Sequence, residues 1–147
     1  MSSLEQSLKS EFPSLRADNH KITSPRADEY NCIAWAAGEN DRWWWPSPSP
    51  YAYWPDGLPL TSTVENFIAA FSTLGYKVCE KETLEATCEK VALYVSISGT
   101  PTHMARQIET GEWTSKLGRD HDIEHSTLDV ISDSIYGSVS KILYRER

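Results

Sequence analysis

Apolar residues recur at helical spacing in two short segments of the chain. In residues 30–40 (YNCIAWAAGEN), Asn31 is a suitable N-cap, the alanines favour helix, and Gly38 suits the left-handed position that ends one. Residues 63–74 carry apolar side chains at intervals of three and four, behind a capping-box pattern at residues 62–65 (STVE). We therefore predict two helices, and the first is apolar enough on all sides to be buried.

Three later segments are rich in β-branched and aromatic residues, which is typical of strands. Turn-forming sequences separate them, so we predict an antiparallel meander. The predicted strands of the meander are residues 91–97, 102–108 and 113–117. We also predict a short strand at residues 76–79, a short helix at 126–134 and a final strand at 138–144.

Two segments lack a regular period. Residues 1–28 are polar and predict a short helix around residues 4–8 followed by an extended lead-in. Residues 42–60 contain five of the eight prolines, which excludes regular helix and central strand and predicts a long ordered loop. The expected organisation is a polar lead-in, residues 1–28, and a single α+β domain, residues 29–147.

The composition narrows the possible functions. The chain has 147 residues, 14 basic against 21 acidic, and a formal net charge of -7, so a nucleic-acid partner is not expected. No apolar run reaches the ~20 residues of a membrane span, and the N-terminus has no signal-peptide core, so we expect no membrane partner and a cytoplasmic location.

Cofactors and cross-links are not expected either. The three cysteines are widely spaced and form no C-x-x-C, which argues against a disulfide framework and a structural zinc site. His121, Asp122 and His125 could supply metal ligands, but their segment does not have a stable helical pattern. We therefore predict neither a metal nor another cofactor.

Cys32 and His103 are the candidate chemical centre. A thiol at a helix N-terminus lies where free backbone N–H groups favour the thiolate and could stabilise an oxyanion. The alternative is a buried structural cysteine. His103 lies at the start of a predicted strand, where it could accept a proton from a thiol or only hydrogen-bond the backbone.

The order of these features resembles the papain-like superfamily, especially its compact NlpC-type branch of cysteine peptidases and amidases. The resemblance implies that Cys32 is the nucleophile, that His103 is the base, and that the orienting residue is Ser115 or Lys116. The chain departs from the family here, because the usual third residue is His, Asn, Asp or Gln. Substitutes for the orienting residue are Gln107, His125 and Glu112.

A second resemblance covers most of residues 29–145. The strings YNCIAWAAG, RWWWP, PTHMARQ and WTSKLG are similar to those of a family of short bacterial proteins with no assigned activity. This resemblance supports the segments as one unit.

Other residues are candidates for substrate binding near the thiol. Tyr30 and Asn31 precede it, and Asn31 could hold the oxyanion or act only as the N-cap. Trp43, Trp44 and Trp45 are expected to divide between the core and an aromatic cleft wall for a peptide, glycan or acyl group.

The predicted strand at residues 102–108 places further candidates by its alternation. If His103 faces the site, Gln107 does too, and Arg106 points away. His125 either faces the site or caps a surface helix.

We expect a thiol-dependent hydrolase or acyl transferase that acts through a Cys–His dyad on an amide, which could be a peptide bond, a cell-wall amide or a glutamine side chain. The expected substrate or partner is a peptide or protein. The rival hypothesis is a non-catalytic protein- or ligand-binding module on a papain-like scaffold. A third is an accessory or immunity-type factor of a bacterial toxin system. The oligomeric state is left open.

Overall fold

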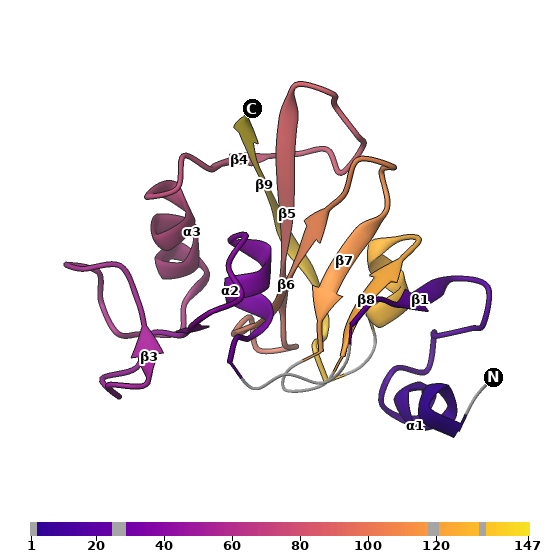
Figure 1. Cartoon of the computed structure of the whole chain (residues 1–147). Helices are drawn as coiled ribbons and strands as arrows, with labels where there is room; N and C mark the ends of the chain where they lie inside the picture. Colours follow the sequence, from indigo (N-terminus) through magenta and orange to yellow (C-terminus); the bar gives the residue numbers. More distant parts are fainter. Residues whose placement is uncertain (1–2, 25–28, 118–120, 133–134) are drawn as a thin grey trace.

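A computed structural model describes residues 3–24, 29–117, 121–132 and 135–147. A seven-stranded sheet of strand order β1-β8-β7-β6-β5-β9-β4 forms its centre, and every neighbouring pair is antiparallel (Figure 1). The helices are α1 (Ser3–Glu11), α2 (Cys32–Ala36), α3 (Val64–Ser72) and the 3-10 helix η1 (Leu128–Ile131). The strands are β1 (His20–Ile22), β2 (Trp43–Trp44), β3 (Ala52–Tyr53), β4 (Lys77–Cys79), β5 (Cys88–Val95), β6 (Pro101–Gln107), β7 (Trp113–Lys116), β8 (Asp122–His125) and β9 (Ser138–Glu146). The α+β class is confirmed.

The sheet separates two hydrophobic clusters. Helices α2 and α3 and the tryptophan loop pack on one face, against side chains that include Val91, Leu93 and Met104. Helix α1 and η1 cover the other face, against Ala92 and Ala105 among others. Because successive strand residues point to opposite faces, the register of β5 and β6 decides which side chains meet α2.

The predicted meander is present as β5, β6 and β7. The final strand β9 also forms, but it inserts between β5 and β4. In the part of the chain that the structure describes, no helix is long and apolar enough to cross a membrane.

Both predicted helices form, with some differences at their ends. The Asn31 side chain caps α2 by accepting from the Ala34 N–H at 3.1 Å, and Gly38 has φ 86°. The N-cap predicted from the capping box at residues 62–65 was wrong by one position. Thr63 is the N-cap of α3, and its side chain accepts a hydrogen bond from the Asn66 N–H. The true first turn therefore starts one residue later.

The polar N-terminal lead-in belongs to the same folded unit as the rest. Leu8, Phe12 and Leu15 are buried in the second cluster, and β1 pairs with β8 at the edge of the sheet. The predicted boundary between a lead-in and a domain at residue 28 was therefore wrong, because the few apolar residues of the N-terminal segment pack on a face of the sheet.

Two short elements differ from expectation. Strand β8 was not predicted, and the helix expected at 126–134 is only the single turn η1; its expected end at Ser134 lies outside the described residues. In the proline-rich loop, β2 and β3 form a two-residue parallel pair, so part of that loop is regular.

Candidate functional site

The structure places Cys32 and His103 on opposite faces of the sheet. Cys32 begins α2 and lies in the first cluster, beside the backbone of Met104. His103 precedes Met104 on β6, so its ring points to the opposite face, where it contacts Tyr94 and Tyr136. The expected Cys–His dyad is therefore not formed, because the strand turns the neighbouring methionine toward the helix.

The Cys32 thiol is not activated by its surroundings. It is 6% exposed, and burial raises its pKa to about 11, against smaller opposing effects from nearby backbone and from Lys116. A nucleophilic cysteine requires a lowered pKa and access. The alternative reading of Cys32 as a structural cysteine fits these facts.

On the other face, His103 belongs to a buried polar chain. Its Nε2 lies 3.0 Å from the Ser115 Oγ, and that oxygen lies 2.8 Å from the His125 Nε2. The His125 Nδ1 donates to the Thr127 carbonyl at 2.9 Å. Burial lowers the pKa of His125 to about 4 and lowers that of His103 well below its ordinary value. Ser115 thus lies beside His103 as expected, but it links two neutral imidazoles in the core.

Lys116, the other candidate for the third position, faces the α2 side. Its side chain is fully buried, with Nζ 5.2 Å from the centre of the Tyr30 ring. The Tyr30 hydroxyl donates to the Asp122 Oδ2 at 2.6 Å, and burial raises the pKa of Tyr30 to about 12. Ser115 and Lys116 are therefore separated by the sheet.

Asn31 acts as a structural clamp. Besides capping α2, its Oδ1 accepts from the Trp44 N–H at 3.1 Å and its Nδ2 donates to the Trp44 carbonyl at 2.6 Å. All polar atoms of the amide are used in this way, so the N-cap alternative explains the residue.

The three consecutive tryptophans divide as expected. Trp44 is 1% exposed in the core, whereas Trp43 and Trp45 are half-buried and line a cavity of about 670 Å³ with Tyr51. Cys32 is not among the residues that line this cavity.

Gln107 and Arg106 each lie on the face of β6 opposite to the one that was expected. The Gln107 amide holds two loops by donating to the Glu82 carbonyl at 2.8 Å and the Gly111 carbonyl at 3.3 Å. Arg106 faces α2, with its guanidinium 4.8 Å from the centre of a Trp35 ring. The alternation was therefore right, and the choice of which face meets α2 was wrong.

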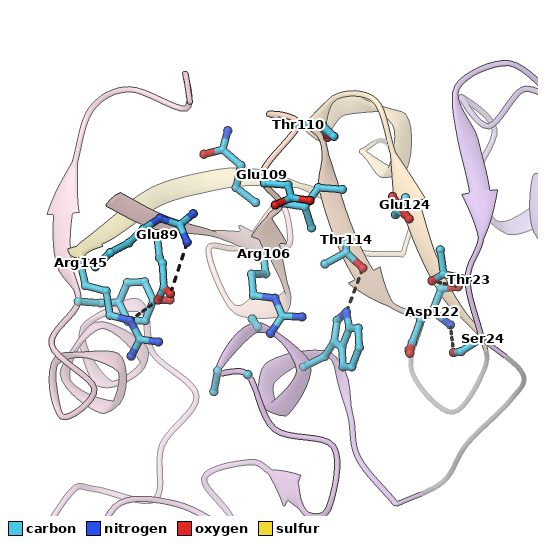
Figure 2. A pocket seen from close by; sticks show the side chains of 18 residues that line it. Thr23, Ser24, Glu89, Arg106, Glu109, Thr110, Thr114, Asp122, Glu124 and Arg145 are labelled. Carbon is cyan, nitrogen blue, oxygen red and sulfur yellow. Dashed lines mark hydrogen bonds and ion pairs between the residues drawn. The ribbon is translucent and has the colours of Figure 1, made fainter. Parts of the chain in front are cut away.

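Arg106 lies in a groove of about 630 Å³ between the C-terminal half of α2 and the sheet (Figure 2). Its floor is formed by β5 to β9, and Trp35 forms part of the wall. Figure 2 shows Arg106 at the centre of the groove, Arg145 and Glu89 on one side, and Asp122 and Glu124 on the other.

The Arg106 guanidinium has no hydrogen bond or ion pair to any residue that the structure describes. It stacks on Trp35 instead, and burial lowers its pKa from the ordinary value. The nearby Glu89 carboxylate is engaged by the Arg145 Nε at 2.6 Å. Arg106 is thus a half-buried cation with unused donors in a groove.

Acidic side chains continue the same surface across the sheet. The register pairs Arg106 with Thr114 and Thr114 with Glu124, so the three lie in one row on the α2 face. Asp122 lies on β8 beside this row, and its Oδ1 is buried without a hydrogen-bond partner among the described residues. The groove therefore has a basic part and an acidic part.

A family model described as "Domain of unknown function (DUF7689)" matches residues 21–144. The chain belongs to this family. The match runs from within β1 to within β9 and so includes the groove and both faces of the sheet. No curated protein and no solved structure matches the chain.

Glu124 was not singled out from the sequence, and Arg106 was expected to point away from the site, whereas both residues line the groove. The available signal was a single arginine within the otherwise uncharged strand PTHMARQ, on the same face as Met104. Within the described ranges, no group of three or more His, Cys, Asp or Glu side chains is placed to bind a metal ion.

Proposed function

We propose that the chain is a non-catalytic ligand-binding module on a papain-like, NlpC-type scaffold, and that its groove holds an acidic group of a small ligand at Arg106. The observation that carries the proposal is the half-buried Arg106 guanidinium, which stacks on Trp35 and has no acidic partner in the described chain. The scaffold part rests on layout, a cysteine-bearing helix packed on an antiparallel meander.

The chemistry of arginine supports an anionic ligand. A guanidinium presents planar N–H donors that match a carboxylate or phosphate in a bidentate arrangement. Stacking on an indole fixes the plane of the guanidinium while leaving its edge free to donate. Because Glu89 is already paired with Arg145, it does not compete strongly for Arg106.

The size of the groove also supports a small ligand. Ligand sites are typically concave spaces of roughly 300–1,000 Å³, with few polar groups placed among apolar ones. The groove, at about 630 Å³, lies within that range, and Trp35 and Tyr76 supply aromatic surface beside the arginines.

Separation of Cys32 from His103 favours binding over hydrolysis. The thiol has a raised pKa, the imidazole is on the far side of the sheet, and neither lines the groove. The hydrolase hypothesis therefore lacks its dyad, and the binding-module alternative is the function that this geometry supports best.

Titration followed by NMR of the arginine Nε–Hε signals tests the proposal. We expect the Arg106 signal to shift on addition of N-acetyl-phenylalanine or inorganic phosphate. Arg106→Gln should remove saturable binding, and Arg106→Lys should weaken it, because the ammonium keeps the charge but cannot stack or bind in a bidentate manner.

Arg16→Gln is the matched control, because Arg16 is exposed, pairs with Asp18 and lies outside the groove. It changes the net charge equally and should leave binding unchanged. If Arg106→Gln and Arg16→Gln bind the anionic probes equally well, the proposal is wrong.

A further inference from the structure

The groove carries opposite charges at the two ends of the row of residues that crosses β6, β7 and β8. Arg106 supplies the positive end, and Glu124 supplies the negative end two strands away. Adjacent strands are about 4.8 Å apart, so the backbones of these two residues are separated by about 10 Å. An occupant held only by Arg106 would leave the acidic end without a partner.

The hydroxyl in the middle of the row is already engaged. The Thr114 Oγ1 accepts from the Trp35 Nε1 at 3.0 Å and donates to the Ile123 carbonyl at 3.1 Å. Thr114 therefore separates the two charged ends and positions the indole under Arg106, while the charges at the ends determine which ligand fits.

The acidic end keeps unused capacity. Glu124 is half-buried, lines the groove, and makes no ion pair or hydrogen bond within the described ranges of the chain. Lys21 lies opposite Glu124 on β1, but it is exposed and forms no ion pair with Glu124.

Asp122 adds a second carboxylate at this end. Lys116, its neighbour in register, balances part of that charge, yet the Oδ1 remains buried without a hydrogen-bond partner among the described residues. A buried acceptor without a hydrogen bond carries the free-energy cost of its lost hydration, and a ligand donor placed beside it would reduce that cost.

We infer that the occupant of the groove is zwitterionic, a free amino acid or a short peptide, with its carboxylate at Arg106 and its ammonium at the Glu124 end. This inference rests on the proposed function, since it assumes that Arg106 holds the acidic group. It adds a requirement for the amine that the proposed function does not contain. The separation of the two ends favours a peptide of two or three residues, whose termini lie farther apart than those of one amino acid.

Calorimetric titration with dipeptides in three matched forms tests the inference. The probes are Ala-Phe, N-acetyl-Ala-Phe and Ala-Phe-amide, together with the same forms of Ala-Ala, Ala-Lys and Ala-Glu. We expect the free dipeptides to bind best. The acetylated forms should bind about fivefold more weakly, the difference that one partly exposed ion pair of about 1 kcal/mol makes.

Glu124→Gln separates the ammonium contact from other effects of acetylation. In this variant we expect the preference for the free forms to shrink, because only Asp122 of the two carboxylates remains at this end. Glu112→Gln is the control, because Glu112 is an exposed hairpin residue outside the groove and should leave the fivefold preference intact. Thermal unfolding of both variants checks that they are folded.

The outcomes distinguish the two proposals. Equal binding of free and acetylated dipeptides to the native chain overturns the zwitterion inference and leaves the proposed function standing. A preference that is undiminished in Glu124→Gln also overturns it. If the amides bind as well as the acids, Arg106 does not hold the carboxylate of the dipeptide and both proposals fail. If no dipeptide binds, the zwitterion inference fails, and the titration of Arg106 with anions decides the proposed function by itself.

Discussion

Replacement of Asn31 by alanine should destabilise the protein strongly, because one amide serves two elements. The variant loses the cap of α2 and both hydrogen bonds to the Trp44 backbone. An N-cap contributes about 1 kcal/mol, and each buried backbone group left unpaired costs about 1–3 kcal/mol. We therefore expect the free energy of unfolding to fall by about 3–4 kcal/mol.

Asn31→Ser separates the two contributions. Serine retains a capping oxygen but is too short to span the two backbone groups of Trp44, so this variant should lose about 2–3 kcal/mol. Urea unfolding followed by tryptophan fluorescence measures both variants. A loss below about 1 kcal/mol in Asn31→Ala would refute the clamp and would reopen an oxyanion-binding role.

Three further predictions follow from burial and backbone geometry. Because burial raises the pKa of Cys32 to about 11, iodoacetamide at pH 8 should label it at least about 100-fold more slowly than free cysteine, measured by peptide mass spectrometry; rapid labelling of the folded protein would contradict this. Because burial lowers the pKa of His125 to about 4, the unfolded chain binds a proton that the folded chain does not, so the free energy of unfolding should fall as the pH drops from about 6.5 to 4. Urea unfolding at several pH values should give a flatter profile for His125→Asn, and equal slopes for the two proteins would be evidence against this origin. Gly137→Ala places a methyl group against the Val95 carbonyl oxygen and should lose at least about 3 kcal/mol, whereas Gly57→Ala, with similar positive φ and open surroundings, should lose about 1 kcal/mol; equal losses in thermal unfolding would exclude the contact.

Local sequence patterns were sufficient to predict much of the architecture. The alternation and turns of residues 91–117 predicted the meander, and the caps predicted α2 and α3, because these features depend on neighbours within a few residues. Strands β1 and β8 are short and carry mixed side chains, so their pairing depends on distant partners and could not be inferred. The position of β9 inside the sheet is also a non-local contact.

Part of the candidate site followed from the sequence. The resemblance to the papain-like superfamily implied that Ser115 or Lys116 lies beside His103, and Ser115 does so. A division of the three tryptophans between the core and a more open surface was also expected. The groove could not be foreseen, because it is formed by α2 and five strands that come together only in the folded chain.

The sequence by itself determined that His103 and Met104 face opposite sides of their strand, and that Arg106 lies on the same side as Met104. Only the tertiary structure decided which of those sides meets α2. Alternation along a strand does not distinguish one face of the sheet from the other. Which face meets α2 therefore depends on where the bulky side chains can be buried. Met104 packs beneath α2, while the His103 ring stacks on Tyr136 at 4.0 Å on the far side. That packing separates the thiol from the imidazole and places Arg106 in the groove.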